Sequence, residues 1–153
     1  MYDVRDLIKK TIALSEKRKA LYFKFLENTA DPRLRILIQI MISRLNQDAV
    51  FYNKILESID EADIEPIDFG AYDMISSLIN QFGRRLEMPT SKTRKEFIHL
   101  VIETEKAVYA LMMDIQGRLA QSEGRTDGIT YRTISKAILN KRFRLEELEN
   151  YKE

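Results

Sequence analysis

Four stretches of the chain carry apolar residues at helical spacing, and a polar or charged residue interrupts each apolar stripe near its middle. The interruptions are Ser15, Asp48, Glu105 and, in the fourth stretch, Lys141 with Arg144. Apolar residues that recur with a period near 3.6 predict amphipathic helices that turn one face toward a common core. A charge on that face is costly unless it is paired. Interruptions at matching depth in four helices therefore indicate one shared interior site.

Turn and capping residues predict how the first two helices connect. Asp3 has the position and chemistry of an N-cap, and Asp31 followed by Pro32 is typical of a capped helix start. Very few residues separate the two predicted helices, so we expect them to form an antiparallel hairpin.

A long connection follows the first hairpin. The acidic stretch 60–70 predicts a loop, residues 72–82 predict a short helix ended by Gly83, and Thr90 or Ser91 is the expected cap of the third long helix. A polar turn at 121–128 then leads into the fourth. The predicted fold is all-α, a ferritin-like antiparallel four-helix bundle of two helical hairpins joined by a long crossover with a short helix, and residues 1–153 form one domain.

Composition narrows the class of protein. A net charge of +1 gives no general attraction to nucleic acid or to an anionic membrane, and acidic residues break up the basic run from Arg84 to Lys95. The absence of cysteine excludes disulfides and thiolate metal sites. The N-terminus lacks the apolar run of a signal peptide, and no run approaches the length of a membrane span. We expect a cytoplasmic protein with no nucleic-acid or membrane partner.

A weak internal repeat relates the two hairpins. Residues 11–22 and 101–112 align without gaps, and this alignment places Ser15 opposite Glu105. A shift by one residue would instead pair Glu16 with Glu105. We prefer the first register because Ser15 lies on the apolar stripe and Glu16 lies at its edge.

Together these features resemble the rubrerythrin-like branch of the ferritin-like superfamily over nearly the whole chain. In that family each hairpin supplies a Glu from its first helix and a Glu-x-x-His from its second, and the six side chains hold two iron or manganese ions. The first Glu stands seven residues before an aromatic, as Ser15 stands before Tyr22. In chain order, the family's ligand positions fall on Ser15, Leu45, Asp48, Glu105, Lys141 and Arg144.

Only Glu105 matches the ligand that the resemblance implies, and Asp48 is the one other residue of this set able to bind a metal. Our hypothesis is that an internal salt-bridge network replaces the di-metal site, with the charges of Asp48 and Glu105 balanced by those of Lys141 and Arg144. Arg18, one turn after Ser15, either joins this network or reaches the surface. No metal, cofactor or catalytic residue is therefore predicted.

Three functional alternatives remain. The first is a non-enzymatic ferritin-like protein that acts through its surfaces or as a homo-oligomer. The resemblance implies the second, an iron- or manganese-binding oxidoreductase or peroxide scavenger. The third is a small-anion binder that uses the polar interior beside Lys141 and Arg144. Ser15 lacks a histidine partner for nucleophilic catalysis, and His99, the only histidine, is expected to face outward.

The second helix carries more apolar surface than one core face needs. Ile36, Ile40 and Phe51 form a second stripe, which packs either under residues 67–82 or against another subunit. Since the proteins that this chain resembles are commonly dimers, the resemblance implies a homodimer.

Overall fold

The computed structural model describes residues 1–151 and is helical throughout its regular structure. The five α-helices are α1 (Val4–Glu27), α2 (Pro32–Ser58), α3 (Phe69–Arg85), α4 (Arg94–Glu123) and α5 (Ile129–Glu149), and a 3-10 turn, η1 (Glu61–Asp63), follows α2. The described part of the chain contains no strand, so the predicted all-α class is confirmed. Residues 152 and 153, the last two of the predicted domain, lie outside the described residues.

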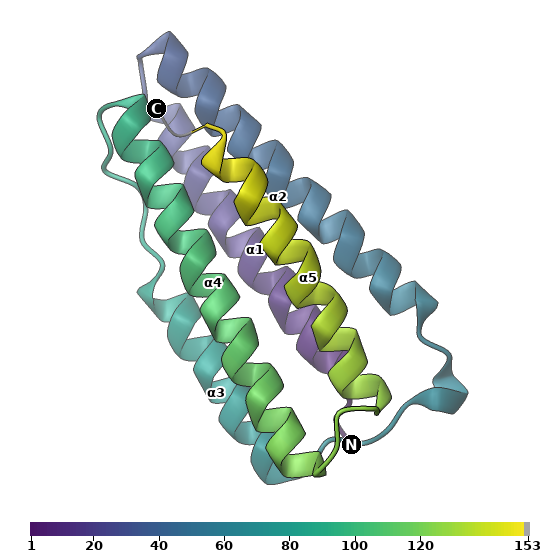
Figure 1. Cartoon of the computed structure of the whole chain (residues 1–153). Helices are drawn as coiled ribbons and strands as arrows, with labels where there is room; N and C mark the ends of the chain where they lie inside the picture. Colours follow the sequence, from purple (N-terminus) through teal and green to yellow (C-terminus); the bar gives the residue numbers. More distant parts are fainter. Residues whose placement is uncertain (152–153) are drawn as a thin grey trace.

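The four longest helices lie lengthwise beside one another, and α3 covers one side of them (Figure 1). Helix α1 packs chiefly against α2, and α4 packs chiefly against α5. Helix α3 packs against both α1 and α4. No helix within residues 1–151 has the combination of length and apolarity that crossing a membrane requires.

Two of the predicted helix starts are confirmed. The Asp3 side chain accepts hydrogen bonds at the start of α1, and Asp6 completes a capping box by accepting from the Asp3 backbone N–H. The Asp31 carboxylate accepts from the Arg33 backbone N–H, with Pro32 at the first helical position. These local signals set the boundaries of the first hairpin.

The predicted end of the short helix is wrong. Helix α3 begins after its cap residue Asp68 and continues through Gly83 to Arg85. A glycine inside a helix costs only about 1 kcal/mol relative to alanine, so tertiary packing can override it. Here Gly83 faces the Leu14 side chain of α1, and its carbonyl accepts a hydrogen bond from Lys17.

The predicted cap of α4 is also wrong. Thr93, rather than Thr90 or Ser91, accepts from the backbone N–H of Glu96. The Glu96 carboxylate accepts in turn from the backbone of Lys92. Several hydroxyl residues precede α4, and Thr93 is the one that stands three residues before Glu96 and caps its backbone N–H.

The connection 59–93 is held against Tyr2, just before the start of α1. The backbone N–H of Ile67 donates to the Tyr2 carbonyl at 2.8 Å, and the Tyr2 and Tyr72 rings stack with centroids 3.9 Å apart. Helix α3 packs against α1 and α4, and Ile36 remains 57% exposed. The alternative that residues 67–82 cover the second stripe of α2 is therefore wrong at Ile36, whereas Phe51, at the other end of the stripe, is partly buried and packs against the cluster that includes Ile67.

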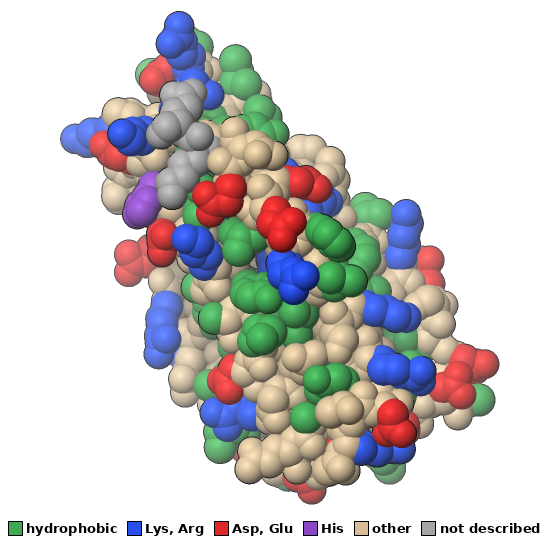
Figure 2. Space-filling model, viewed as in Figure 1, with side chains coloured by type: hydrophobic (Ala, Val, Ile, Leu, Met, Phe, Trp, Pro, Cys, Tyr) green, Lys and Arg blue, Asp and Glu red, His purple; other side chains and the backbone are tan. Residues whose placement is uncertain are grey.

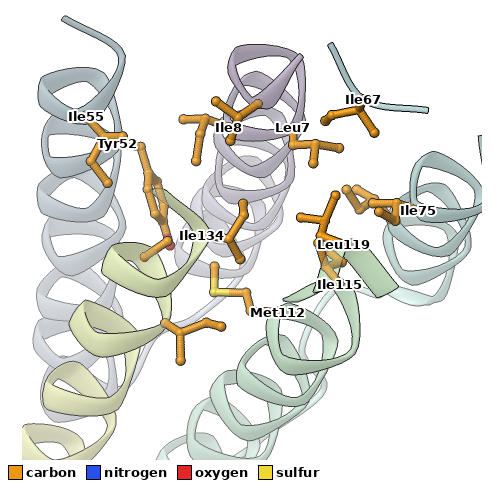
Figure 3. Close-up of a cluster of buried hydrophobic side chains, with 14 of the residues drawn as sticks. Leu7, Ile8, Tyr52, Ile55, Ile67, Ile75, Met112, Ile115, Leu119 and Ile134 are labelled. Atoms are coloured by element: carbon orange, nitrogen blue, oxygen red, sulfur yellow. The ribbon is translucent and has the colours of Figure 1, made fainter. Parts of the chain in front are cut away.

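Two apolar clusters fill the interior. The first includes Leu7, Tyr52, Leu119 and Ile134 (Figure 3), and the second includes Phe97 and its neighbours from the opposite ends of the same helices. The interruptions of the four stripes fall between the two clusters along every long helix. The packing therefore leaves a polar layer with apolar layers on both sides of it.

Candidate functional site

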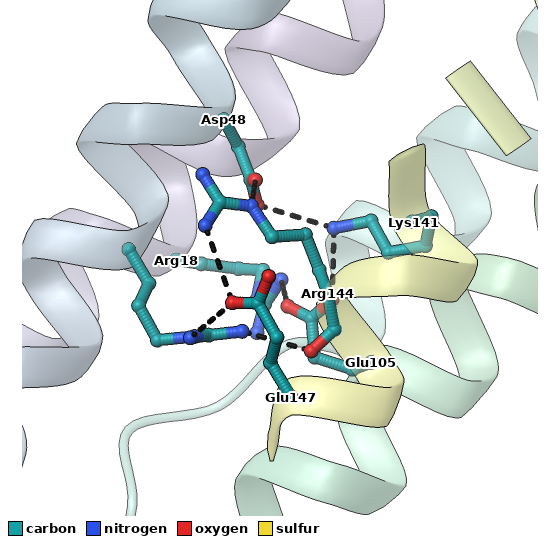
Figure 4. Close-up of polar contacts among 7 residues, drawn as sticks. Arg18, Asp48, Glu105, Lys141, Arg144 and Glu147 are labelled. Atoms are coloured by element: carbon teal, nitrogen blue, oxygen red, sulfur yellow. Dashed lines mark hydrogen bonds and ion pairs between the residues drawn. The ribbon is translucent and has the colours of Figure 1, made fainter. Parts of the chain in front are cut away.

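Charged side chains from four helices meet in this polar layer (Figure 4). The Nζ atom of Lys141 donates to Glu105 Oε2 at 2.8 Å and to Asp48 Oδ2 at 3.2 Å. Arg18 Nη1 donates to Glu105 Oε1 at 2.6 Å, and Arg144 Nε lies 3.2 Å from Asp48 Oδ1. The structure thus brings together all five residues that the sequence assigned to an interior network, two of them from α5 and one from each of α1, α2 and α4.

The centre of the network is closed to solvent. Lys141 is 1% exposed, and Arg18, Asp48 and Glu105 are each at most 4% exposed. Arg144 reaches the edge, with its side chain 19% exposed. Salt screens ion pairs that are buried to this extent much less than it screens pairs on a protein surface.

Two residues that the sequence analysis missed extend the network to the surface. The exposed Glu147 lies 3.3 Å from Arg44 Nη1 and 3.8 Å from Arg144 Nη1. Arg44 Nη2 also donates to the Arg144 carbonyl at 2.8 Å. The spacing of Glu147, three residues after Arg144 on the same helix face, is the signal that could have identified it.

Arg18 is part of the network, which resolves the alternative that the sequence left open. It changes the charge balance, because Arg18, Lys141 and Arg144 face only two buried carboxylates, those of Asp48 and Glu105. The expected neutral set of two pairs is therefore wrong. The four fully buried groups, Arg18, Lys141, Asp48 and Glu105, balance one another. The third cation, Arg144, lies at the exposed edge, where Glu147 adds a third carboxylate.

The network keeps its central groups charged. Burial would raise the pKa of Glu105, but attraction to Lys141 and Arg18 outweighs that effect and lowers this pKa to about 2. Burial would likewise lower the pKa of Lys141, whereas attraction to Glu105 and Asp48 raises it above its usual value. Both groups therefore stay ionised far to either side of neutral pH.

The low pKa of Glu105 predicts a loss of stability in acid. A carboxyl group whose pKa is lower in the folded state than in the unfolded state stabilises the fold. For Glu105 this stabilisation is fully present above about pH 4.5 and is lost as the pH falls toward 2. Because Glu105 is fully buried, this shift of its pKa corresponds to about 3 kcal/mol of folding free energy. We expect the stability advantage of the wild type over Glu105→Gln to shrink by about this amount between pH 5 and pH 2, as measured by urea unfolding. A stability difference between the wild type and Glu105→Gln that stays constant across this pH range would contradict the conclusion that Glu105 is ionised.

Of the six positions that the resemblance assigns to metal ligands, five are buried and Arg144 is partly exposed, but their chemistry does not fit a pair of metal ions. Ser15 and Leu45 offer no carboxylate, although both are buried on the core faces of α1 and α2. Hard cations prefer several oxygen ligands, and here two carboxylates are already matched by three cationic side chains. Within residues 1–151, no three or more His, Asp or Glu side chains form a group able to hold a metal ion.

The space beside the network is also small. A hollow bordered by Leu45, Asp48, Glu105 and Arg144 has a volume of about 10 Å³. A site of that size holds about one water molecule at most. This hollow beside Arg144 is therefore too small for an organic anion of the kind that the third functional alternative requires.

Tyr52 is a further buried polar group. It is 0% exposed, lies four residues after Asp48 on α2, and its hydroxyl has no hydrogen-bond partner within residues 1–151. Burial raises the pKa of Tyr52 to about 12, so the hydroxyl stays protonated. His99, by contrast, is exposed on α4, as its position between stripe residues predicted.

Comparison of the chain with protein-family models, with curated proteins and with solved structures finds no match. The geometry of the buried network, together with the spacing of its residues in the sequence, therefore carries the functional proposal.

Proposed function

We propose that this chain is a rubrerythrin-like member of the ferritin-like superfamily, built as a four-helix bundle, in which the buried ion-pair network takes the place of the di-metal centre. The observation that carries this proposal is the position of Lys141. Its ammonium group bridges Glu105 and Asp48 from two other helices, at 2.8 and 3.2 Å. A cationic side chain thereby does what a metal cation does in such a site, which is to hold carboxylates from different helices together.

The same network argues for a non-enzymatic role. A general acid or base works best when its pKa lies near the operating pH. Glu105 has a pKa of about 2, and the pKa of Lys141 is raised above its usual value, so neither exchanges a proton readily near neutrality. The buried charges hold four helices in register, and the protein acts through its surfaces.

Introducing the family's metal ligands tests the proposal that the ion pairs occupy the positions of a di-metal centre. The variant S15E/R18M/L45E/D48H/K141E/R144H supplies the ligand set that the resemblance implies and removes the cation at position 18. We expect it to bind about two manganese or iron ions per chain, whereas the wild type binds none tightly. Elemental analysis after metal loading and desalting measures the difference.

A matched control carries the same substitutions together with Glu105→Ala, and we expect it to bind metal more weakly. If the restored variant is unfolded without metal, circular dichroism during Mn²⁺ addition reports folding coupled to binding. A restored variant that folds but takes up no more metal than the wild type would contradict the assignment of these positions.

The surface role that we propose includes a homodimer. Ile36 on α2 and Phe143 on α5 are 57% and 54% exposed, and Leu139, one turn before Phe143, is 48% exposed. Figure 2 shows apolar side chains gathered over the middle of the face on which α5 lies in front. Large apolar side chains grouped on a surface are typical of an interaction site.

Sedimentation analysis at micromolar concentration tests the dimer. We expect a mass of twice the 18.0 kDa of one chain. Ile36→Glu should shift the equilibrium toward monomer because it places a charge in the apolar contact. Met113→Glu makes the same change on α4 at a side chain that is 45% exposed and serves as the control. A wild-type protein that sediments as a monomer would overturn this part of the proposal.

A further inference from the structure

One side of α2 faces solvent along nearly the whole helix, and we call it the outer face. From Arg33 to Glu57 its residues recur at alternating spacings of three and four, and all of them are exposed except the half-buried Ile40. Ile36 and Val50 on this face are 57% and 54% exposed. Helix α2 lies at an edge of the bundle and packs against α1 and α4 with its other side (Figure 1). Residues at this spacing line one side of a helix and can form a straight seam with a second helix.

The outer face has complementary chemistry at its two ends. The exposed cation Arg33 lies at the start of the face, and the exposed anion Glu57 lies at its end. The apolar residues Ile40 and Val50 lie between them, one in each half of the face. A two-fold axis through the middle of α2 therefore brings unlike charges together and places apolar residues against one another, as an isologous contact between identical helices requires.

We propose that two copies of the chain pair through their α2 helices, which run antiparallel, in the register that places Ile40 opposite the partner's Val50. The same register places Arg33 opposite the partner's Glu57, and symmetry makes each of these contacts twice. This inference rests on the proposed homodimer and adds to it the helix that pairs, its direction and its register.

The other positions of the outer face also fit this register. Ser43 lies opposite the partner's Gln47, so two exposed polar side chains meet near the two-fold axis. Ile36 lies opposite the partner's Lys54, whose aliphatic stem can cover the isoleucine while its ammonium group stays in water. The seam therefore buries no charge without a partner or access to solvent.

Other arrangements of the same two faces are less favourable. Parallel helices would place Arg33, Lys54 and Glu57 each beside its own copy, and like charges repel. A shift of the antiparallel register by one heptad would place Ile40 opposite the partner's Glu57 or Ser43 and remove the apolar contact. Charge and apolar pairing thus favour the same register.

Charge reversal tests the direction of the helices. Arg33→Glu and Glu57→Arg each place like charges opposite one another, and we expect each to raise the Kd of the dimer by roughly fivefold to tenfold. The double variant R33E/E57R restores attraction and should return the Kd to near the wild-type value. Both changes favour the helix itself, because they put an anion in its first turn and a cation in its last turn. A double variant as weak as the single variants would overturn this pairing.

Cysteine crosslinking tests the register, since the chain contains no cysteine of its own. We expect I40C/V50C to form a covalent dimer on mild oxidation, seen on a non-reducing gel. The two positions are about 15 Å apart along one helix, too far for a disulfide within the chain. The single variant Ile40→Cys and the variant I40C/E57C, which matches a register shifted by one heptad, are the controls and should stay uncrosslinked.

Sedimentation of the wild type, run alongside, separates the possible failures. A covalent dimer of Ile40→Cys alone would indicate parallel helices, and a covalent dimer of I40C/E57C would indicate the shifted register, so either result overturns the proposal. A protein that sediments as a dimer while I40C/V50C does not crosslink would overturn the α2 seam and leave the homodimer in place. A protein that sediments as a monomer would overturn both, whereas the metal content tests the ion-pair placement independently.

Discussion

Replacing Lys141 with methionine should lower the free energy of unfolding by about 3–5 kcal/mol, the usual cost of removing one partner from a buried ion pair. Methionine has a similar length and keeps most of the packing, so the loss reports the charge. Without the ammonium group, Glu105 retains only Arg18, and Asp48 retains only the partly exposed Arg144. Each carboxylate would keep one cationic partner, but no side chain would bridge Glu105 on α4 to Asp48 on α2.

Urea unfolding at neutral pH measures this effect. Lys136→Met is the matched control, because Lys136 lies on the same helix and is exposed. Surface substitutions of this kind usually change stability by no more than about 0.5 kcal/mol. If the two variants lose the same small amount, Lys141 does not bridge the carboxylates as described.

The second large effect is expected for Glu105→Gln. The Glu105 carboxylate accepts from both Arg18 and Lys141, and all three side chains are buried. A neutral amide would leave three cations in the layer with only Asp48 as a counter-charge, so we expect a loss of about 3–5 kcal/mol at neutral pH. This loss is larger than that of a single hydrogen bond because the cations of the layer would be left without a counter-charge.

Asp48→Asn is the appropriate comparison for Glu105→Gln. Asp48 pairs with Lys141 and with Arg144, whose side chain is 19% exposed and can be solvated by water. We therefore expect Asp48→Asn to cost less than Glu105→Gln in the same unfolding experiment. The reverse order would show that Glu105 is not the centre of the network.

The sequence was most informative where the signals were local or repeated. Asp3 and the pair Asp31-Pro32 predict helix starts because capping depends on a few neighbouring residues. The interrupted stripes predict the network because side chains on the core faces of packed helices converge. The same reasoning failed at Gly83, where contact with α1 carries α3 past a residue that is a poor helix former.

Features that depend on side-chain paths could not be predicted. The sequence places Arg18 on the core stripe but does not say whether so long a side chain pairs inside or extends to solvent. Its pairing with Glu105, which is 87 residues away in the chain, depends on how α1 and α4 pack. The membership of Arg18 in the network follows from that one conformation, and so it could not be inferred from spacing.

The central claim is that the buried ion pairs stand at the positions that the resemblance to rubrerythrin-like proteins assigns to the ligands of two metal ions. Elemental analysis of wild-type protein, loaded with iron or manganese and then desalted, tests it most directly. We predict well under one bound ion per chain, because Lys141 already bridges Glu105 and Asp48. About two tightly bound ions per chain, the content of an intact site of this family, would contradict the claim.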